Sequence, residues 1–119
     1  MSGINGRLTR DPRSSLFEKH LPNTPQVQRL LRKEGKAHLF NDRVTMESVI
    51  QAIMERGEIT GVENETDDYE RYGLYFDPPI GYQLRSDGSC IPLYYAEIKI
   101  LKGTDFYHVI PRTKPRLTN

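Results

Sequence analysis

The stretch IPLYYAEIKIL (91–101), KGTD (102–105) and FYHVIPRT (106–113) predicts two β-strands joined by a tight turn. Both outer segments are rich in aromatic and β-branched residues, which favour strands. Gly103 supplies the positive φ that a tight turn needs, and the side chain of Asp105 can hydrogen-bond the local backbone. We therefore expect an antiparallel hairpin, and the rest of the chain must cover this hairpin or extend its sheet.

The first strand of the hairpin has two unlike faces, because successive side chains of a strand point to opposite sides. One face is mainly aliphatic and carries Tyr94, Ala96, Ile98 and Ile100. The other face is mixed and carries Leu93, Tyr95, Glu97 and Lys99. We expect the aliphatic face to pack against the core, which leaves two charged side chains among rings on the mixed face.

Two helices are predicted before the strands. Thr24 can cap the free N–H groups of the first helix, and Pro25 suits its first position. Asn41 or Asp42 can cap the second helix, which runs to about Arg56. The apolar stripe of this second helix consists of Met46, Val49, Ile50, Ile53 and Met54. We expect it to pack on the aliphatic face of the sheet.

Alternating patterns predict further strands over 58–62, 69–76 and 80–85. An acidic loop over 63–68 and a hairpin loop over 86–89 separate them. The predicted fold class is α+β, with two N-terminal helices followed by a four- to five-stranded antiparallel β-meander.

The 119 residues suffice for one domain with one modest core. Residues 1–15 are expected to form a flexible basic arm, 16–115 a single α+β domain and 116–119 a frayed tail. No apolar run approaches the roughly 20 residues of a membrane span, and the N-terminus lacks the apolar segment of a secretory signal. Cys90 is the only cysteine, which excludes an intramolecular disulfide and a zinc site built on several thiolates. A cytoplasmic location is the simplest interpretation.

The net charge of +1 hides an uneven distribution. Residues 1–36 hold eight basic and three acidic groups, whereas residues 37–110 hold six basic and thirteen acidic groups. Basic ends favour binding to anions, with Arg7, Arg10 and Arg13 as candidate contacts to nucleic acid or a protein partner. The alternative is that the basic ends neutralise the acidic middle or are simply solvated.

Six side chains form the candidate catalytic set: His38, Arg43, Lys99, His108, Arg112 and Thr113. RNA can be cleaved by attack of its 2′-OH on the neighbouring phosphate, which requires a base, an acid and cations near the phosphate. Histidine titrates near neutrality and suits both proton transfers, while arginine and lysine hold phosphate oxygens. Tyr95 and Tyr107 can stack on bases. Fixed donors of this kind act without a metal, and no cofactor is expected. For each residue alone, an ordinary half-buried or surface role is the alternative.

The segment HLFNDR (38–43), which opens a helix, and the closing segment IPRTKP (110–115) carry a resemblance to a known group. The helical N-terminal part and the antiparallel strands, over roughly residues 36–115, look like the barnase–EndoU–colicin–RelE group of metal-independent ribonucleases, many of them bacterial toxins. The resemblance implies His38 or His108 as general base or acid. It implies Arg43, Lys99, Arg112 and Thr113 as phosphate contacts. The acidic middle of this chain departs from the strong positive field of most ribonucleases.

Two other function classes are consistent with the sequence. One is a non-enzymatic interaction module, in which the basic arm, the acidic loop and the tyrosine-rich strands bind a protein partner, and sheet edges allow self-association. The other is a nucleic-acid binder without catalysis, whose affinity falls steeply with salt. The expected partners are therefore RNA or a protein, and no membrane.

Overall fold

The computed structural model describes residues 8–13, 15–60 and 69–114. Arg7 and the acidic loop over 63–68, both singled out in the sequence, lie outside these residues. The helices are α1 (Ser15–Glu18), α2 (Pro25–Glu34) and α3 (Arg43–Arg56). The strands are β1 (Thr9–Arg10), β2 (Lys36–Phe40), β3 (Glu58–Ile59), β4 (Tyr69–Tyr75), β5 (Gly81–Arg85), β6 (Cys90–Leu93), β7 (Tyr95–Leu101) and β8 (Phe106–Arg112).

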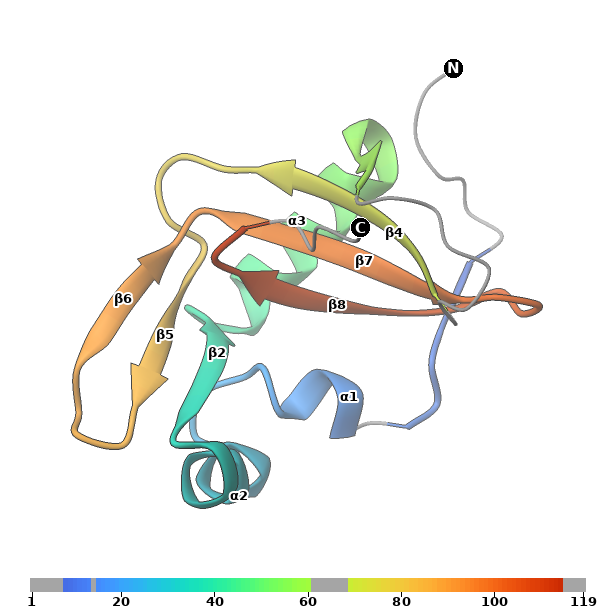
Figure 1. Ribbon diagram of the computed structural model, residues 1–119. Coiled ribbons are helices and arrows are strands. Elements are labelled where there is room, and N and C mark those ends of the chain that lie inside the picture. The colour runs from blue at the N-terminus through green and yellow to red at the C-terminus, as the bar shows by residue number, and fades with distance from the viewer. Residues whose placement is uncertain (1–7, 14, 61–68, 115–119) are drawn as a thin grey trace.

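The described strands form two sheets, with the orders β1-β8-β7-β4-β3 and β2-β5-β6. In Figure 1, β4, β7 and β8 run side by side with α3 behind them, and β2, β5 and β6 lie to the left, with α2 below β2. The α+β class is confirmed. The single antiparallel meander after two N-terminal helices is wrong, because β2 precedes α3 in the chain and β1, within the predicted arm, pairs with β8 in parallel.

The predicted first strand of the organising hairpin is interrupted at Tyr94. Its N-terminal part is β6 in the small sheet, and its C-terminal part is β7 in the large one. The carbonyl of Tyr94 accepts a hydrogen bond from the backbone N–H of Phe76, and the Tyr94 side chain is 45% exposed. The placement of Tyr94 on the core face is therefore wrong, because the chain turns from one sheet to the other at this residue.

The segment 36–40, which the sequence predicts only as a short extended stretch before the second helix, is the full strand β2. It pairs antiparallel with β5 from Lys36 opposite Arg85 to Phe40 opposite Gly81. A Cβ at Gly81 would lie 2.0 Å from the carbonyl oxygen of Leu39, so a glycine is required where the two backbones approach. The segment has only five residues, and its partner strand lies some 45 positions away in the sequence. A pattern of neighbouring residues therefore gives little indication of this strand.

The main core lies between α3 and the large sheet, as predicted. The α3 side chains Met46, Val49, Ile50 and Ile53 pack with Ala96, Ile98 and Ile100 of β7. Asp42 caps α3, since its carboxylate accepts a hydrogen bond from the backbone N–H of Thr45 at 2.7 Å. The predicted side-chain cap of α2 is wrong, because the Thr24 hydroxyl donates to the carbonyl oxygen of Glu18 at 2.7 Å instead.

Candidate functional site

The face of the large sheet opposite α3 carries ionisable and hydroxyl side chains. We call this surface the polar face and define it by Tyr69, Arg71, Tyr95, Glu97, Lys99, His108 and Arg112. Strand register brings these residues together, since directly paired residues share a face. Lys99 pairs with Arg71 on one side and His108 on the other, and Tyr95 pairs with Arg112.

Glu97 lies at the centre of the polar face and is fully buried. Its Oε1 is 3.3 Å from Nη1 of Arg112 and 3.6 Å from Nε of Arg71. Its Oε2 accepts hydrogen bonds from the hydroxyls of Tyr95 at 3.1 Å and Thr60 at 3.4 Å. A buried carboxylate is tolerated when charges and donors surround it in this way. Glu97 therefore fixes Arg112, whose side chain remains 28% exposed, at the surface of the sheet.

Gly73 makes the contact between Tyr95 and Glu97 possible. It pairs with Glu97 across β4 and β7. A Cβ at Gly73 would lie 1.8 Å from the Tyr95 hydroxyl oxygen, so the ring occupies the space that a side chain would fill. Burial raises the pKa of Tyr95, which keeps its hydroxyl protonated as a donor.

Lys99 and His108 face each other across β7 and β8 and share a contact with Tyr69. The Lys99 Nζ lies 4.5 Å from the centre of the Tyr69 ring, and the His108 ring meets the same ring edge-on at 5.5 Å. Burial, with a further contribution from Arg71, lowers the pKa of Lys99 to about 8. Burial and the Lys99 ammonium lower the pKa of His108 to about 4. At neutral pH the site thus holds a neutral imidazole next to a lysine that is easily deprotonated.

Asp11 and Arg13 border this pair. The Asp11 carboxylate accepts hydrogen bonds from Nη2 of Arg13 at 2.7 Å and from Nε at 3.0 Å. These bonds lower the pKa of Asp11 to about 2. The Asp11 charge opposes the lowering of the His108 pKa but does not overcome burial.

A pocket of about 170 Å³ adjoins the polar face at Ile110, which lies on β8 between His108 and Arg112. We call it the histidine pocket; its lining consists of Lys19, His20, Leu30, Glu34, Lys36, Ala37, His38 and Ile110. His20 and Ala37 are buried, whereas Glu34 and Lys36 are exposed and form the mouth. Two histidines, His20 and His38, therefore line the pocket, and the charge of His108 contributes to the lowered pKa of His20.

Hydrogen bonds fix the protons of the two pocket histidines. Nδ1 of His20 lies 2.8 Å from the carbonyl oxygen of His38, so this nitrogen carries the hydrogen. Arg85 Nε donates to Oε1 of Gln83 at 3.0 Å, which turns the amide NH2 of Gln83 toward Nε2 of His38 at 2.9 Å. His38 therefore accepts at Nε2 and carries its hydrogen on Nδ1. Burial lowers the pKa of His38, which favours this neutral form.

The burial of His20 predicts an acid-dependent loss of stability. Its pKa is lowered to about 3 by burial, from an ordinary value of 6.5. Below pH 6.5 the unfolded chain binds a proton at His20, whereas the folded chain does not until the pH approaches 3. The stability that neutral His20 gives the fold is therefore fully present above pH 6.5 and is lost as the pH falls toward 3. Between pH 7 and pH 4.5 we expect His20 to remove about 2–3 kcal/mol of the free energy of unfolding.

Urea denaturation of the wild type and His20→Phe at the two pH values measures this contribution. The variant is expected to lose less stability than the wild type on acidification, by the stated amount. An equal loss in both proteins would contradict the assignment.

The structure brings together only part of the set predicted from the sequence. Lys99, His108, Arg112 and Tyr95 lie on the polar face, and His38 lies in the adjoining histidine pocket. Arg43 and Thr113 are exposed, the first at the start of α3 on the other side of the sheet and the second just beyond β8.

The remaining candidates for nucleic-acid or partner binding have other contacts. Tyr107 lies on the core face, where its ring meets Phe17 edge-on. Arg10 forms an ion pair with Glu47, and Arg13 is held by Asp11. Sequence reasoning missed His20 and Gln83, for which no periodic pattern gave a signal. The alternation of side chains in β4 predicts that Tyr69 and Arg71 share one face of the strand. It does not indicate that they belong to a functional site.

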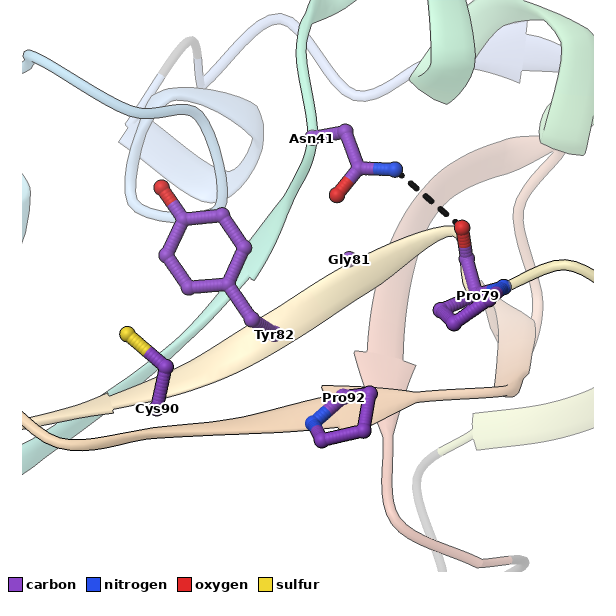
Figure 2. A pocket seen from close by; sticks show the side chains of 6 residues that line it. All are labelled: Asn41, Pro79, Gly81, Tyr82, Cys90 and Pro92. Carbon is purple, nitrogen blue, oxygen red and sulfur yellow. Dashed lines mark hydrogen bonds between the residues drawn. The ribbon is translucent and has the colours of Figure 1, made fainter.

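A second hollow, of about 550 Å³, lies on the outer side of the small sheet. Figure 2 shows the Tyr82 ring and the Cys90 thiol standing on the same side of β5 and β6, and the Asn41 amide donating to the carbonyl oxygen of Pro79. Pro79, Gly81 and Pro92 complete its lining. This surface is mainly apolar and has no lysine, arginine, histidine or carboxylate in its lining.

Among residues 8–13, 15–60 and 69–114, no three His, Cys, Asp or Glu side chains gather as a metal ion would require. None of the helices in this part of the chain is long and apolar enough to cross a membrane.

We compared the chain with protein families, curated proteins and solved structures, and one family matches. No curated protein and no solved structure matches the chain. A family model described as Domain of unknown function (DUF6972) matches residues 7–116, which include every described strand and helix. The chain therefore belongs to the DUF6972 family.

Proposed function

We propose that this protein is a metal-independent ribonuclease whose reaction centre is the Lys99–His108 pair. The observation that supports this proposal is that the two side chains are direct cross-strand partners with pKa values of about 8 and about 4. Between these values one group is protonated and the other is not, which is the arrangement that general acid–base catalysis needs.

The roles follow from the protonation states. His108 accepts the proton of the ribose 2′-OH as the 2′-oxygen forms a bond to phosphorus, and Lys99 donates a proton to the 5′-oxygen as its bond to phosphorus breaks. The products are a 2′,3′-cyclic phosphate and a free 5′-hydroxyl. Arg112, held by Glu97, contacts the phosphate oxygens. Arg43 and Thr113 are not part of this centre, because their positions are remote from the pair.

Incubation of the protein with a single-stranded RNA in the presence of EDTA tests the proposal. We expect fragments that end in 2′,3′-cyclic phosphate, and no cleavage of a DNA of the same sequence, because DNA lacks the 2′-OH. Absence of RNA fragments, or loss of cleavage caused by EDTA, would overturn it.

The two other function classes remain distinguishable by the same experiment. RNA that is bound in a salt-dependent manner but stays intact would indicate a binder without catalysis. If RNA is neither bound nor cleaved, the apolar hollow beside β6 favours a protein-interaction module. Pro92 lacks a backbone N–H, so β6 offers one donor fewer to a strand that would add to its edge. A cytoplasmic location, where RNA is accessible, accords with the ribonuclease proposal.

A further inference from the structure

The histidine pocket contains a buried acceptor without a partner. His20 is 4% exposed, and its Nε2 has no hydrogen-bond partner in the described part of the chain. Because Nδ1 carries the hydrogen that reaches the His38 carbonyl, Nε2 of the neutral ring has a lone pair to offer. A buried polar atom left in this state costs free energy, so it points to a ligand that supplies a donor.

The same pocket contains a fixed donor. The Arg85–Gln83 pair occupies Nε2 of His38 and leaves the hydrogen on Nδ1. Gln83 is itself only 6% exposed, so this arrangement is held by its surroundings and not by solvent. Both histidines line the pocket, so a ligand seated against them would have to offer a donor to Nε2 of His20 and an acceptor to Nδ1 of His38.

The lining excludes a phosphate as the group bound deepest. A phosphodiester, the form of phosphate within an RNA chain, offers only acceptor oxygens near neutral pH, and these would repel the lone pair of His20. The apolar side chains of Leu30, Ala37 and Ile110 instead suit a flat, uncharged ring. The volume of about 170 Å³ equals that of roughly five or six liquid waters, enough for one small ring system.

We propose that the histidine pocket binds the edge of a nucleobase, with Nε2 of His20 accepting from a base N–H and Nδ1–H of His38 donating to the neighbouring ring nitrogen or carbonyl oxygen. Nucleobase edges present a donor beside an acceptor in this way. Lys19 and Lys36 of the lining then lie near the backbone of the same nucleotide. This inference rests on the proposed function, since that function makes RNA the ligand. The base next to the reacting phosphate would then occupy the histidine pocket, beside Ile110.

A titration of 15N-histidine-labelled protein with nucleoside monophosphates at millimolar concentration tests the inference by NMR. Nucleotides are expected to shift the resonances of His20 Nε2 and His38 Nδ1, whereas ribose 5-phosphate and inorganic phosphate leave them in place. Equal shifts with ribose 5-phosphate would mean that the sugar hydroxyls occupy the pocket and would overturn the nucleobase assignment. No shift with any nucleotide would also overturn it.

Two variants sharpen the test. Gln83→Glu accepts from both Arg85 and His38, which moves the His38 hydrogen to Nε2, and His20→Phe removes the acceptor. Each is expected to weaken nucleotide binding at least tenfold, while the exposed Gln51→Glu on α3 leaves it unchanged. Unchanged affinity in a folded Gln83→Glu variant would contradict the proposal. Because binding is measured without turnover, a protein that binds nucleotides but does not cleave RNA refutes the ribonuclease proposal alone.

Discussion

Replacing Glu97 with glutamine is expected to lower the free energy of unfolding by about 3–5 kcal/mol. The carboxylate is fully buried within 3.6 Å of two arginines and accepts two hydroxyl hydrogen bonds. A neutral amide cannot balance the charges of Arg71 and Arg112. Its NH2 group would also face either the arginine N–H groups or the two hydroxyls, all of which are hydrogen-bond donors. Removing a buried carboxylate that faces two arginine side chains is among the largest effects a single substitution has.

Urea denaturation at pH 7 measures this effect, with Glu70→Gln as the matched control. Glu70 is exposed on the neighbouring strand β4, so the same chemical change there should alter stability by less than about 0.5 kcal/mol. If both variants unfolded at the same urea concentration as the wild type, Glu97 would not be the electrostatic centre of the polar face.

Lys99→Met and His108→Phe are each expected to reduce the rate of RNA cleavage by about 10²–10⁴-fold, the usual contribution of a general acid or base. Both substitutions roughly keep the bulk of the side chain and remove its nitrogen atoms, so neither variant can transfer a proton at that position. The Lys99 change separates catalysis from folding, because the lysine is desolvated and lies near Arg71 and Arg112. Removing its charge relieves repulsion, so the melting temperature should stay the same or rise while activity falls.

The exposed lysine at position 33, in the last turn of α2, provides the control. Lys33→Met removes a charge from the surface and is expected to leave both cleavage and melting temperature unchanged. Cleavage by Lys99→Met at the wild-type rate would exclude Lys99 as the proton donor. A loss of activity that tracked a loss of folded protein would indicate a structural role instead.

The sequence predicts the elements of this fold better than their arrangement. Local signals suffice for α3, where Asp42 caps a helix with a clear apolar stripe, and for the β7–β8 hairpin with its turn at Gly103. The bend at Tyr94 escapes prediction because alternation continues on both sides of it. The assignment of β2 and β6 to a second sheet depends on contacts between distant segments, which no local pattern records.

The same limit applies to the site. Alternation placed Glu97 and Lys99 on one face, and the hairpin register brings His108 to that face opposite Lys99. Arg43 and Thr113 lie next to the ends of predicted elements. A position at the end of a helix or strand does not determine on which side of the sheet the side chain lies. His20 gained its position from burial beneath β2 and its bond to the His38 carbonyl, and both are tertiary effects. Perturbed pKa values likewise arise from burial that only the folded chain provides.

The pH dependence of RNA cleavage by the wild-type protein tests the central proposal most directly. Since His108 must be neutral and Lys99 charged, the rate is predicted to be nearly constant between about pH 5 and 7, to fall below pH 4 and to fall again above pH 8. A rate that instead changes around pH 6.5, where an unperturbed histidine titrates, would contradict the assignment of this pair. Absence of cleavage at every pH would contradict the ribonuclease proposal itself.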